Sequence, residues 1–346
     1  MKGLKRLAAL GLAACLLAGC APAQTQAAPA AENTFFAMDT VMTLRLYEGG
    51  DGALLDQAED RVKELEALLS VTDPDSEIYA LNRDGAAELS PETAQLLDAA
   101  LGMCGRTAGA LDVSIYPILR SWGFTTGEYA IPTEAELAAL LPLVDYTKVE
   151  WDGARAALPD GMEIDLGSVA KGYTGDVLAA SLKENGVTSA MLDLGGNIQT
   201  VGAKPDGSPW RVGIRDPEGD GNIGVVTVED QAVVTSGGYE RYFEEDGVRY
   251  WHILDPETGS PARGGLISVT VIGNSGLVCD GLSTALFVMG KEKAIAFWLD
   301  NVFELHFGLV LVEEDGFITY TCNSGFVPAE GRRAGDVNYP EPLPQP

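Results

Sequence analysis

The sequence predicts an α+β fold, with one domain built on a mainly antiparallel sheet that is flanked by helices. Helical periodicity dominates the first half of the chain, whereas strand-like runs fill most of residues 190–322. Two Asp-Gly pairs, Asp246-Gly247 and Asp315-Gly316, lie between strand-like runs and are typical of hairpin turns. Helices early in the chain and hairpins late favour this arrangement over a doubly wound parallel sheet.

The N-terminal segment has the features of a secretory signal. Three basic residues precede the apolar run LAALGLAACLLAG, which is too short to cross a bilayer permanently. The run ends in Leu-Ala-Gly-Cys, which resembles the lipobox of bacterial lipoproteins, so we expect loss of residues 1–19 and lipidation of Cys20. A plain secreted protein with a chance cysteine at this position is the alternative. We therefore expect an extracytoplasmic protein that its lipid anchors to the cell membrane.

The Ala-, Pro- and Gln-rich residues 20–33 are expected to form a flexible tether. The folded domain is expected to cover residues 34–327. Within it, "ALLDQAEDRVKELEALLS" carries apolar residues at helical spacing, which predicts an amphipathic helix over 53–70. Further helices are expected after "LSPET" near residue 91, at "IPTEAELAALL", and from about Ser168.

Most of the remaining domain has the pattern of strands. The strand-like runs are "SAMLDLGGNIQTVG", "PWRVGIRDP", "IGVVTVEDQAVVTS", "RYFEEDGVRYWHIL", "GGLISVTVIG" and "FGLVLVEEDGFITYT". The tail, residues 328–346, is rich in Pro and Glu and is expected to be disordered.

Composition excludes several classes of function. The formal net charge is −28, which repels phosphate backbones and argues against nucleic-acid binding. Beyond the signal and Cys20 the chain has Cys104, Cys279 and Cys322, an odd number without CxxC spacing, so neither a disulfide framework nor a zinc site is implied. With only two histidines in the chain, His-rich metal sites are also excluded. An anionic ligand would have to meet a local group of cations or a bound metal.

Asp280 and Thr284 stand four residues apart at the start of an otherwise apolar segment, "CDGLSTALFVMG". One interpretation is a helix N-cap, in which Asp280 accepts hydrogen bonds from free backbone N–H groups. The other is that carboxylate and hydroxyl oxygens meet as ligands for Mg2+, which prefers hard oxygen donors. Residues taken alone leave both open.

Two glycine-containing segments could supply the rest of such a site. In "EIDLGSVAKGYTGD" a strand gives way to a helix that carries Lys171, an arrangement suited to phosphate, although Asp165 and Ser168 are also typical helix-capping residues. It is not a Walker A loop, because Lys171 precedes Gly172. The adjacent glycines of "DLGGNIQTVG" indicate either close approach of a ligand or backbone, or a β-bulge.

Read in order, these stretches resemble the FAD:protein FMN transferase (ApbE-type) family. The matching blocks are "AMDTVMTLRLY", "SEIYALN", "LDVSIYPILRSWGF", "IDLGSVAKGYTGD", "MLDLGGNIQTVG", "VVTSGGYERYF", "HILDPETGSPA" and "CDGLSTALFVMG". They span nearly the whole chain after the signal. The resemblance implies an ApbE-like, T-fold-related architecture.

The resemblance also implies a Mg2+-dependent reaction outside the cytoplasm. FAD would be the substrate, FMN would be attached through a phosphoester bond to a Thr or Ser of an exported redox protein, and AMP would be released. By motif position the metal ligands would be Asp280, Thr284, Ser168 and a backbone carbonyl of Ser283. The positions that correspond to FAD contacts are Met38, Ser76, Tyr79, Ser121, Trp122, Gly123, Asp165, Lys171 and Ile253.

His252 opens the block "HILDPETGSPA" and is expected to be functional, either as a base for the acceptor hydroxyl or as a phosphate contact, although a lone histidine is more often structural. Two residues depart from the family pattern: Gly281 replaces a frequent Ala, and Gly238 a frequent Asp.

Two other functions stay open at this point. They are a Mg2+-dependent FAD pyrophosphatase that forms FMN and AMP, and a flavin-binding lipoprotein without catalysis.

Overall fold

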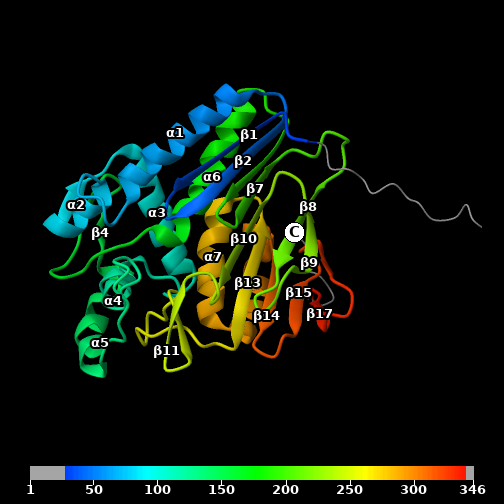
Figure 1. Ribbon diagram of the computed structural model, residues 1–346. Coiled ribbons are helices and arrows are strands. Elements are labelled where there is room, and N and C mark those ends of the chain that lie inside the picture. The colour runs from blue at the N-terminus through cyan, green and yellow to red at the C-terminus, as the bar shows by residue number, and fades with distance from the viewer. Residues whose placement is uncertain (1–27, 340–346) are drawn as a thin grey trace, which may run out of the picture.

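The central feature of the computed structural model, which describes residues 28–339, is a nine-stranded sheet (Figure 1). All neighbouring strands are antiparallel except the last pair, β15 and β17. In spatial order the strands are β1 (Ala31–Ala37), β2 (Thr40–Glu48), β6 (Ser189–Leu194), β7 (Asn197–Val201), β10 (Ala232–Gly237), β13 (Leu266–Gly273), β14 (Phe307–Glu313), β15 (Ile318–Thr321) and β17 (Ala334–Val337). The predicted fold class, α+β with a mainly antiparallel sheet, is confirmed.

The middle of this sheet is buried on both faces, which explains the nearly continuous apolar sequence of its central strands. In β14, Leu309 and Leu311 point toward the helices, and the alternate residues Val310 and Val312 point toward a second sheet. That second sheet has three strands: β16 (Phe326–Pro328), β9 (Asn222–Val228) and β8 (Trp210–Arg215).

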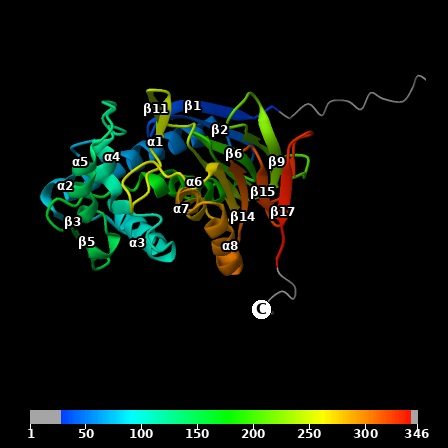
Figure 2. The same ribbon diagram turned by 90° about the horizontal axis from the view of Figure 1, so that it is seen from below.

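Helices cover the other face of the large sheet, with α6 and α7 side by side in both views (Figures 1 and 2). A group of smaller elements forms one end of the molecule beside them. The helices are α1 (Gly52–Leu69), α2 (Glu77–Asp84), α3 (Pro91–Arg106), α4 (Tyr116–Ser121), α5 (Glu134–Leu140), α6 (Gly167–Glu184), α7 (Gly276–Met289) and α8 (Lys291–Leu305). The smaller sheets are β3 (Ala86–Glu88), β5 (Arg155–Ala157) and β4 (Glu150–Trp151), and the hairpin of β11 (Tyr242–Glu245) and β12 (Val248–Trp251).

Local sequence signals located most of these elements correctly. The apolar positions of the first predicted helix, 53–70, are all buried in α1: Leu55, Ala58, Val62, Leu65 and Leu69. Both Asp-Gly pairs are hairpin turns, one between β11 and β12 and one between β14 and β15. The hairpin of β1 and β2 was not predicted, although Met42, Leu44 and Leu46 alternate with more exposed residues in the manner of a half-buried strand.

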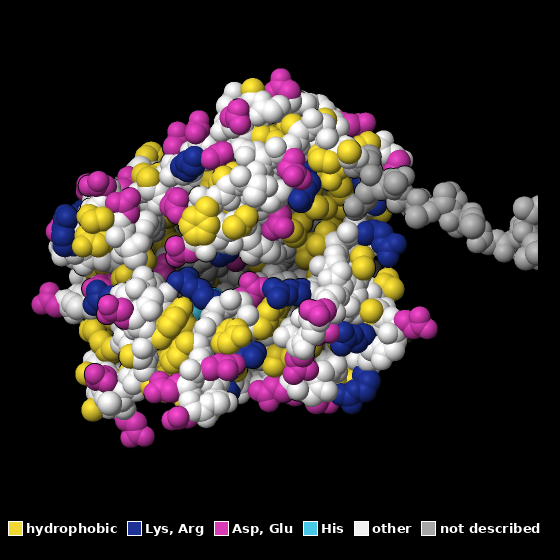
Figure 3. Space-filling view, viewed as in Figure 1, with side chains coloured by type: hydrophobic (Ala, Val, Ile, Leu, Met, Phe, Trp, Pro, Cys, Tyr) yellow, Lys and Arg dark blue, Asp and Glu magenta, His cyan; other side chains and the backbone are white. Residues whose placement is uncertain are grey.

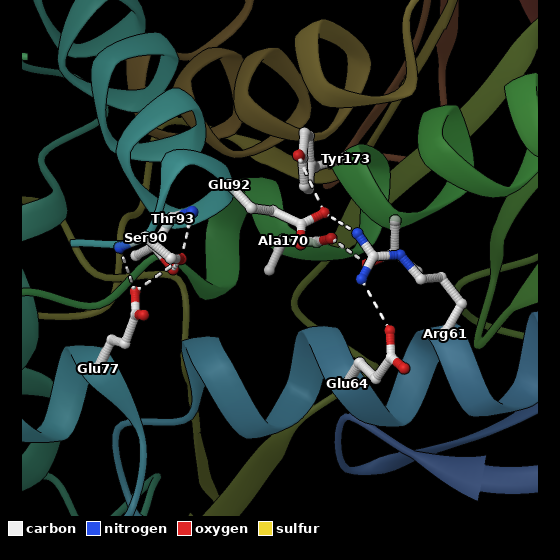
Figure 4. Close-up of polar contacts among 9 residues, drawn as sticks. Arg61, Glu64, Glu77, Ser90, Glu92, Thr93, Ala170 and Tyr173 are labelled. Atoms are coloured by element: carbon white, nitrogen blue, oxygen red, sulfur yellow. Dashed lines mark hydrogen bonds and ion pairs between the residues drawn. The ribbon is translucent and has the colours of Figure 1, made fainter. Parts of the chain in front are cut away.

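Polar contacts join four of the helices, α1, α2, α3 and α6 (Figure 4). Arg61 of α1 forms an ion pair with Glu92 of α3, and the hydroxyl of Tyr173 of α6 lies 3.5 Å from the same carboxylate. Ser90, the N-cap of α3, donates from its hydroxyl to the Glu77 carboxylate of α2 over 3.0 Å. These contacts connect α2 and α3 to the helices that lie against the sheet.

Two predicted boundaries are wrong. The disordered tail predicted for 328–346 contains β17, whose residues pair with β15, and Tyr339 stacks on Trp298 of α8 with ring centroids 5.0 Å apart. The edge of β15 was available for pairing, and this outweighs the polar composition of the segment. The predicted tether also ends earlier than residue 33, because β1 begins at Ala31. The signal segment, Cys20 and residues 340–346 lie outside the described residues.

Candidate active site

A cavity of about 330 Å3 opens between α6, α7, the β1–β2 turn and the smaller elements at the end of the molecule. Figure 3 shows a hollow on this face, with basic and acidic side chains around its rim. Of the residues proposed from the sequence, those lining the cavity are Met38, Asp165, Ser168, Lys171, His252, Ile253, Asp280 and Thr284. Segments from opposite ends of the chain therefore meet at one site.

Asp280 is not a helix cap. Helix α7 begins at Gly276, its N-cap is Ser275, and Asp280 lies within the helix with 5% of its surface exposed. Its Oδ2 accepts a hydrogen bond from the backbone N–H of Gly172 in α6 over 2.8 Å. The capping interpretation is therefore wrong. The preceding strand ends at Gly273, as its apolar pattern indicated, but the helix begins only three residues later, at Gly276, so Asp280 lies in its second turn.

Opposing effects act on the charge of Asp280. Burial raises its pKa, whereas the Lys171 ammonium and the Gly172 N–H lower it. Burial likewise raises the pKa of Asp165, whose Oδ1 accepts from the N–H of Gly167 over 2.8 Å. The N-cap of α6 is Leu166, so Asp165 accepts from the first N–H of the helix while standing one residue before the cap position. A cation held near either carboxylate would favour its ionised form.

The oxygen atoms near Asp280 fit a hard cation such as Mg2+. The Ser236 hydroxyl lies 2.8 Å from the Ser283 hydroxyl and 3.4 Å from that of Thr284. One carboxylate with neighbouring hydroxyls suits a cation that keeps several waters and takes phosphate oxygens from its substrate. Among residues 28–339, no three His, Cys, Asp or Glu side chains are grouped as a metal site. Ser283 is fully buried, does not line the cavity, and donates to the Asp280 carbonyl over 2.8 Å.

His252 lies half-buried in the cavity wall with a defined tautomer. Its Nδ1 is 3.1 Å from the Arg241 carbonyl oxygen. Because a carbonyl only accepts, Nδ1 carries the proton and Nε2 is left unprotonated. Burial lowers the pKa of His252 to about 4, and the nearby cations Arg241 and Lys171 act in the same direction. The imidazole is therefore neutral near pH 7 and able to accept a proton.

Ser76 and Tyr79 lie outside the cavity wall. Ser76 is the N-cap of α2, where its buried hydroxyl accepts from the Tyr79 N–H over 2.9 Å and donates to the Ser70 carbonyl. Ser70 itself lines the cavity. In this structure the two residues support the wall rather than form it.

The turn Ser121-Trp122-Gly123 is also outside the cavity wall and serves packing. The buried Trp122 ring donates from Nε1 to the Gly259 carbonyl over 2.8 Å. Gly123 has φ +80, and a Cβ there would lie 2.0 Å from the Glu128 carbonyl oxygen. These residues hold the aromatic cluster beside His252, which includes Phe124, 6.3 Å from the imidazole.

Several cavity residues were missed as individual candidates. Within blocks that the resemblance used, the cavity-lining residues without an assigned role include Asp39, Gly195, Asn197, Ser236, Gly237, Glu240 and Arg241. Arg241 reaches across the rim, 3.8 Å from Asp39, while its carbonyl holds His252. Glu66 was missed because it lies on the polar side of the α1 pattern; it accepts from the Met38 N–H over 2.6 Å.

The adjacent glycines of the DLGGNIQTVG segment, and the two glycines that depart from the family pattern, have structural explanations. Gly195 and Gly196 form the two-residue turn between β6 and β7, both with positive φ, so the β-bulge interpretation is wrong. The next residue, Asn197, lines the cavity, and its buried Nδ2 makes no hydrogen bond of good geometry within the described residues.

Gly238 lies against Trp251, whose ring a Cβ would meet at 2.9 Å, and at Gly281 a Cβ would meet Met103 Cγ at 3.0 Å. Both departures from the family pattern thus coincide with tight packing.

Known proteins resemble this chain over most of its length. The ApbE family model matches residues 38–305. An FAD:protein FMN transferase of Vibrio cholerae is 34% identical over 284 residues, 79% of this chain and 84% of that protein. One of Treponema pallidum is 35% identical over 282 residues, covering 74% and 78%.

Solved structures show the same similarity. An ApbE protein of Thermotoga maritima superposes with a TM-score of 0.78 at 34% identity, covering 83% of this chain and 96% of that one. The flavinyl transferase ApbE of Pseudomonas stutzeri, in its apo form, gives a TM-score of 0.73 at 31% identity, covering 86% and 93%. Sequence and fold agree, and the chain belongs to the ApbE family of enzymes.

Proposed function

We propose that this protein is an FAD:protein FMN transferase that uses Mg2+, attaches FMN to a Thr or Ser hydroxyl of an acceptor protein, and releases AMP. The observation that supports this most directly is the meeting of Asp280, Thr284, Lys171 and His252 at one cavity. The similarity to enzymes named FAD:protein FMN transferase supports the same reaction.

The residues of the cavity can be assigned to two tasks: removal of the proton from the acceptor hydroxyl, and stabilisation of the pyrophosphate. The acceptor oxygen forms a bond to the FMN phosphorus, the pyrophosphate bond breaks, and AMP leaves with the bridging oxygen. His252 Nε2 takes the proton of the acceptor hydroxyl, since its neutral form is held by the Arg241 carbonyl. Lys171 lies where its charge can stabilise the pyrophosphate, and the Asn197 amide offers a further donor.

Asp280 and Thr284 of α7 would hold the cation, together with Ser168 of the adjacent helix α6. Bound Mg2+ would neutralise pyrophosphate charge, which explains how a protein of net charge −28 can bind an anion. Met38 and Ile253 offer apolar contacts to the flat rings of FAD.

The test is incubation of the purified protein, without its signal segment, with FAD, Mg2+ and exported proteins separated from the same cells. The expected result is an acceptor protein that keeps flavin fluorescence on a denaturing gel and gains the mass of FMN at a Thr or Ser. Release of free FMN and AMP alone would mean that water is the acceptor, so the protein would be an FAD pyrophosphatase. Retention of uncleaved FAD in the presence of Mg2+ would indicate a flavin-binding protein.

We further propose that Cys20 carries a lipid that anchors the enzyme on the outer side of the cell membrane, where exported redox proteins are its acceptors. The sequence before Cys20 supports this. Among the described residues, no helix combines the length and hydrophobicity that crossing a bilayer requires. Mass spectrometry of the mature N-terminus, and a Cys20→Ser variant that leaves the membrane fraction, would test the anchor.

A further inference from the structure

Helices α6 and α7 make a reciprocal contact through two segments of the same pattern. Gly172 and Asp176 lie four residues apart in α6, and Gly276 and Asp280 lie four apart in α7. Asp280 Oδ2 accepts from the Gly172 N–H over 2.8 Å, and Asp176 Oδ1 accepts from the Gly276 N–H over 2.6 Å. Each aspartate therefore bonds to the glycine of the other helix.

The glycines let the two backbones touch. A Cβ on Gly172 would lie 2.1 Å from the Gly276 carbonyl oxygen, and one on Gly276 would lie 2.4 Å from the Gly172 carbonyl oxygen. Any other residue at these positions would separate the helices. The separation of α6 and α7 is thus set by backbone contact together with the two carboxylates.

The two aspartates differ in how many of their carboxylate oxygens are engaged between the helices. Asp176 uses both oxygens at the start of α7, since Oδ2 also accepts from the Leu277 N–H over 3.0 Å and the Ser275 hydroxyl over 2.9 Å. Asp280 is bonded through Oδ2 to Gly172 and lines the cavity. Asp176 does not line the cavity.

We infer that Asp176 is a positioning residue for the cation and pyrophosphate site. Helix α6 carries Ser168 and Lys171, and α7 carries Asp280 and Thr284, so the register of the two helices sets the distances among these four groups. Asp176 determines that register by holding the first N–H groups of α7, which lack partners within the helix. This inference rests on the proposed function for the identity of the ligands.

The test compares Asp176→Asn with Asp51→Asn. Asp51 is a matched control, because it also caps a helix, accepting from the Ala53 N–H over 3.0 Å at the start of α1, and it is outside the cavity wall. In Asp176→Asn an NH2 group replaces one accepting oxygen and faces donors. The measurements are the dissociation constants of Mn2+, by electron paramagnetic resonance, and of FAD, by flavin fluorescence, together with the melting temperature.

We expect Asp176→Asn to weaken binding of Mn2+ and of FAD in its presence by about 10- to 100-fold, the usual effect of removing a group that orients a ligand. Asp51→Asn should leave both constants unchanged. A lower melting temperature with unchanged constants in Asp176→Asn would overturn the inference. If that variant does not fold, Ser275→Ala takes its place, because it removes one of the three groups that donate to Asp176. The same two dissociation constants are measured, and a smaller increase in each is expected.

The results that would contradict the proposed function differ from those that would contradict the role of Asp176. A wild-type protein that binds Mn2+ and FAD but labels no acceptor would contradict transfer while leaving the positioning test intact. A wild-type protein that does not bind Mn2+ would contradict the cation site, and the FAD constant alone would then decide the role of Asp176.

Discussion

The carboxylate of Asp280 is held by the backbone of Gly172, with 2.8 Å between Oδ2 and the amide nitrogen. The bond crosses from α7 to α6 and joins residues 108 positions apart in the chain. It restricts the rotation of a buried side chain in the cavity wall. Asp280 is therefore oriented before any ligand arrives, which lowers the cost of binding a cation.

Replacing Asp280 by Asn should abolish turnover without unfolding the protein. The Asn carbonyl oxygen can still accept from Gly172, but the charge that would hold the cation is lost. Asp280→Ala should also be inactive and less stable by about 1–3 kcal/mol, because it removes a hydrogen bond between a buried carboxylate and the Gly172 N–H. Release of AMP from FAD measures turnover, and urea unfolding measures stability. Unchanged AMP release by Asp280→Asn would remove Asp280 from the cation site.

Lys171→Gln should weaken FAD binding while the fold is kept. A hydrogen bond to a charged group contributes about 1.5–3 kcal/mol, so the dissociation constant should rise at least about tenfold. The control is Lys183→Gln near the end of the same helix, where Lys183 pairs with Asp230 over 2.8 Å. Flavin fluorescence titrations of the two variants measure the difference, and equal affinities would contradict the role of Lys171.

Gly172→Ala and Gly102→Ala should change stability in opposite directions. At Gly172 the added Cβ would meet the Gly276 carbonyl oxygen at 2.1 Å and Asp280 Cβ at 2.7 Å, so the helices must separate. Gly102 lies within α3 and has no atom within 4 Å of such a Cβ. There alanine should stabilise the protein by about 0.5–1 kcal/mol, because it favours the helix. Urea midpoints of both variants test this; a tolerated Gly172→Ala would contradict the close helix contact.

His252 should make the protein less stable in mild acid. Its pKa in the folded protein is lowered to about 4 from an ordinary value near 6.5, chiefly by burial. Between these values the unfolded chain binds a proton that the folded protein does not, so this contribution is complete above about pH 6.5 and is lost as the pH falls toward 4. His252→Gln should therefore lose less stability than the wild type between pH 7 and pH 5.

Urea midpoints at the two pH values measure the loss. The carboxylates of Asp165 and Asp280 titrate with the opposite sign, because their pKa values are raised. They are present in both proteins, so the comparison isolates His252. Equal losses in the wild type and His252→Gln would show that the imidazole is not held neutral.

Local structure was predictable wherever the decisive interactions are close in sequence. Helix α1 follows from the spacing of Leu55 to Leu69, and the hairpins at Asp246-Gly247 and Asp315-Gly316 follow from residues that accept turn conformations. Lys171 and Asp280 drew attention as charges inside glycine-rich or apolar segments, but helix capping stayed open until the resemblance assigned them to the site; the structure places both in the cavity lining. The resemblance added residues with no such signal, such as Met38.

By itself, the sequence determined the fold class and most helices and hairpins, since periodicity and turn residues encode these locally, and it supplied candidate residues for the site. Only the tertiary structure decided that Asp280 bonds to Gly172 rather than to its own helix start, that Trp122 packs away from the cavity wall, and that residues 334–337 form a strand. These outcomes depend on which surfaces meet. Contacts between residues more than 100 positions apart, such as that of Asp176 with Leu277, leave no local pattern.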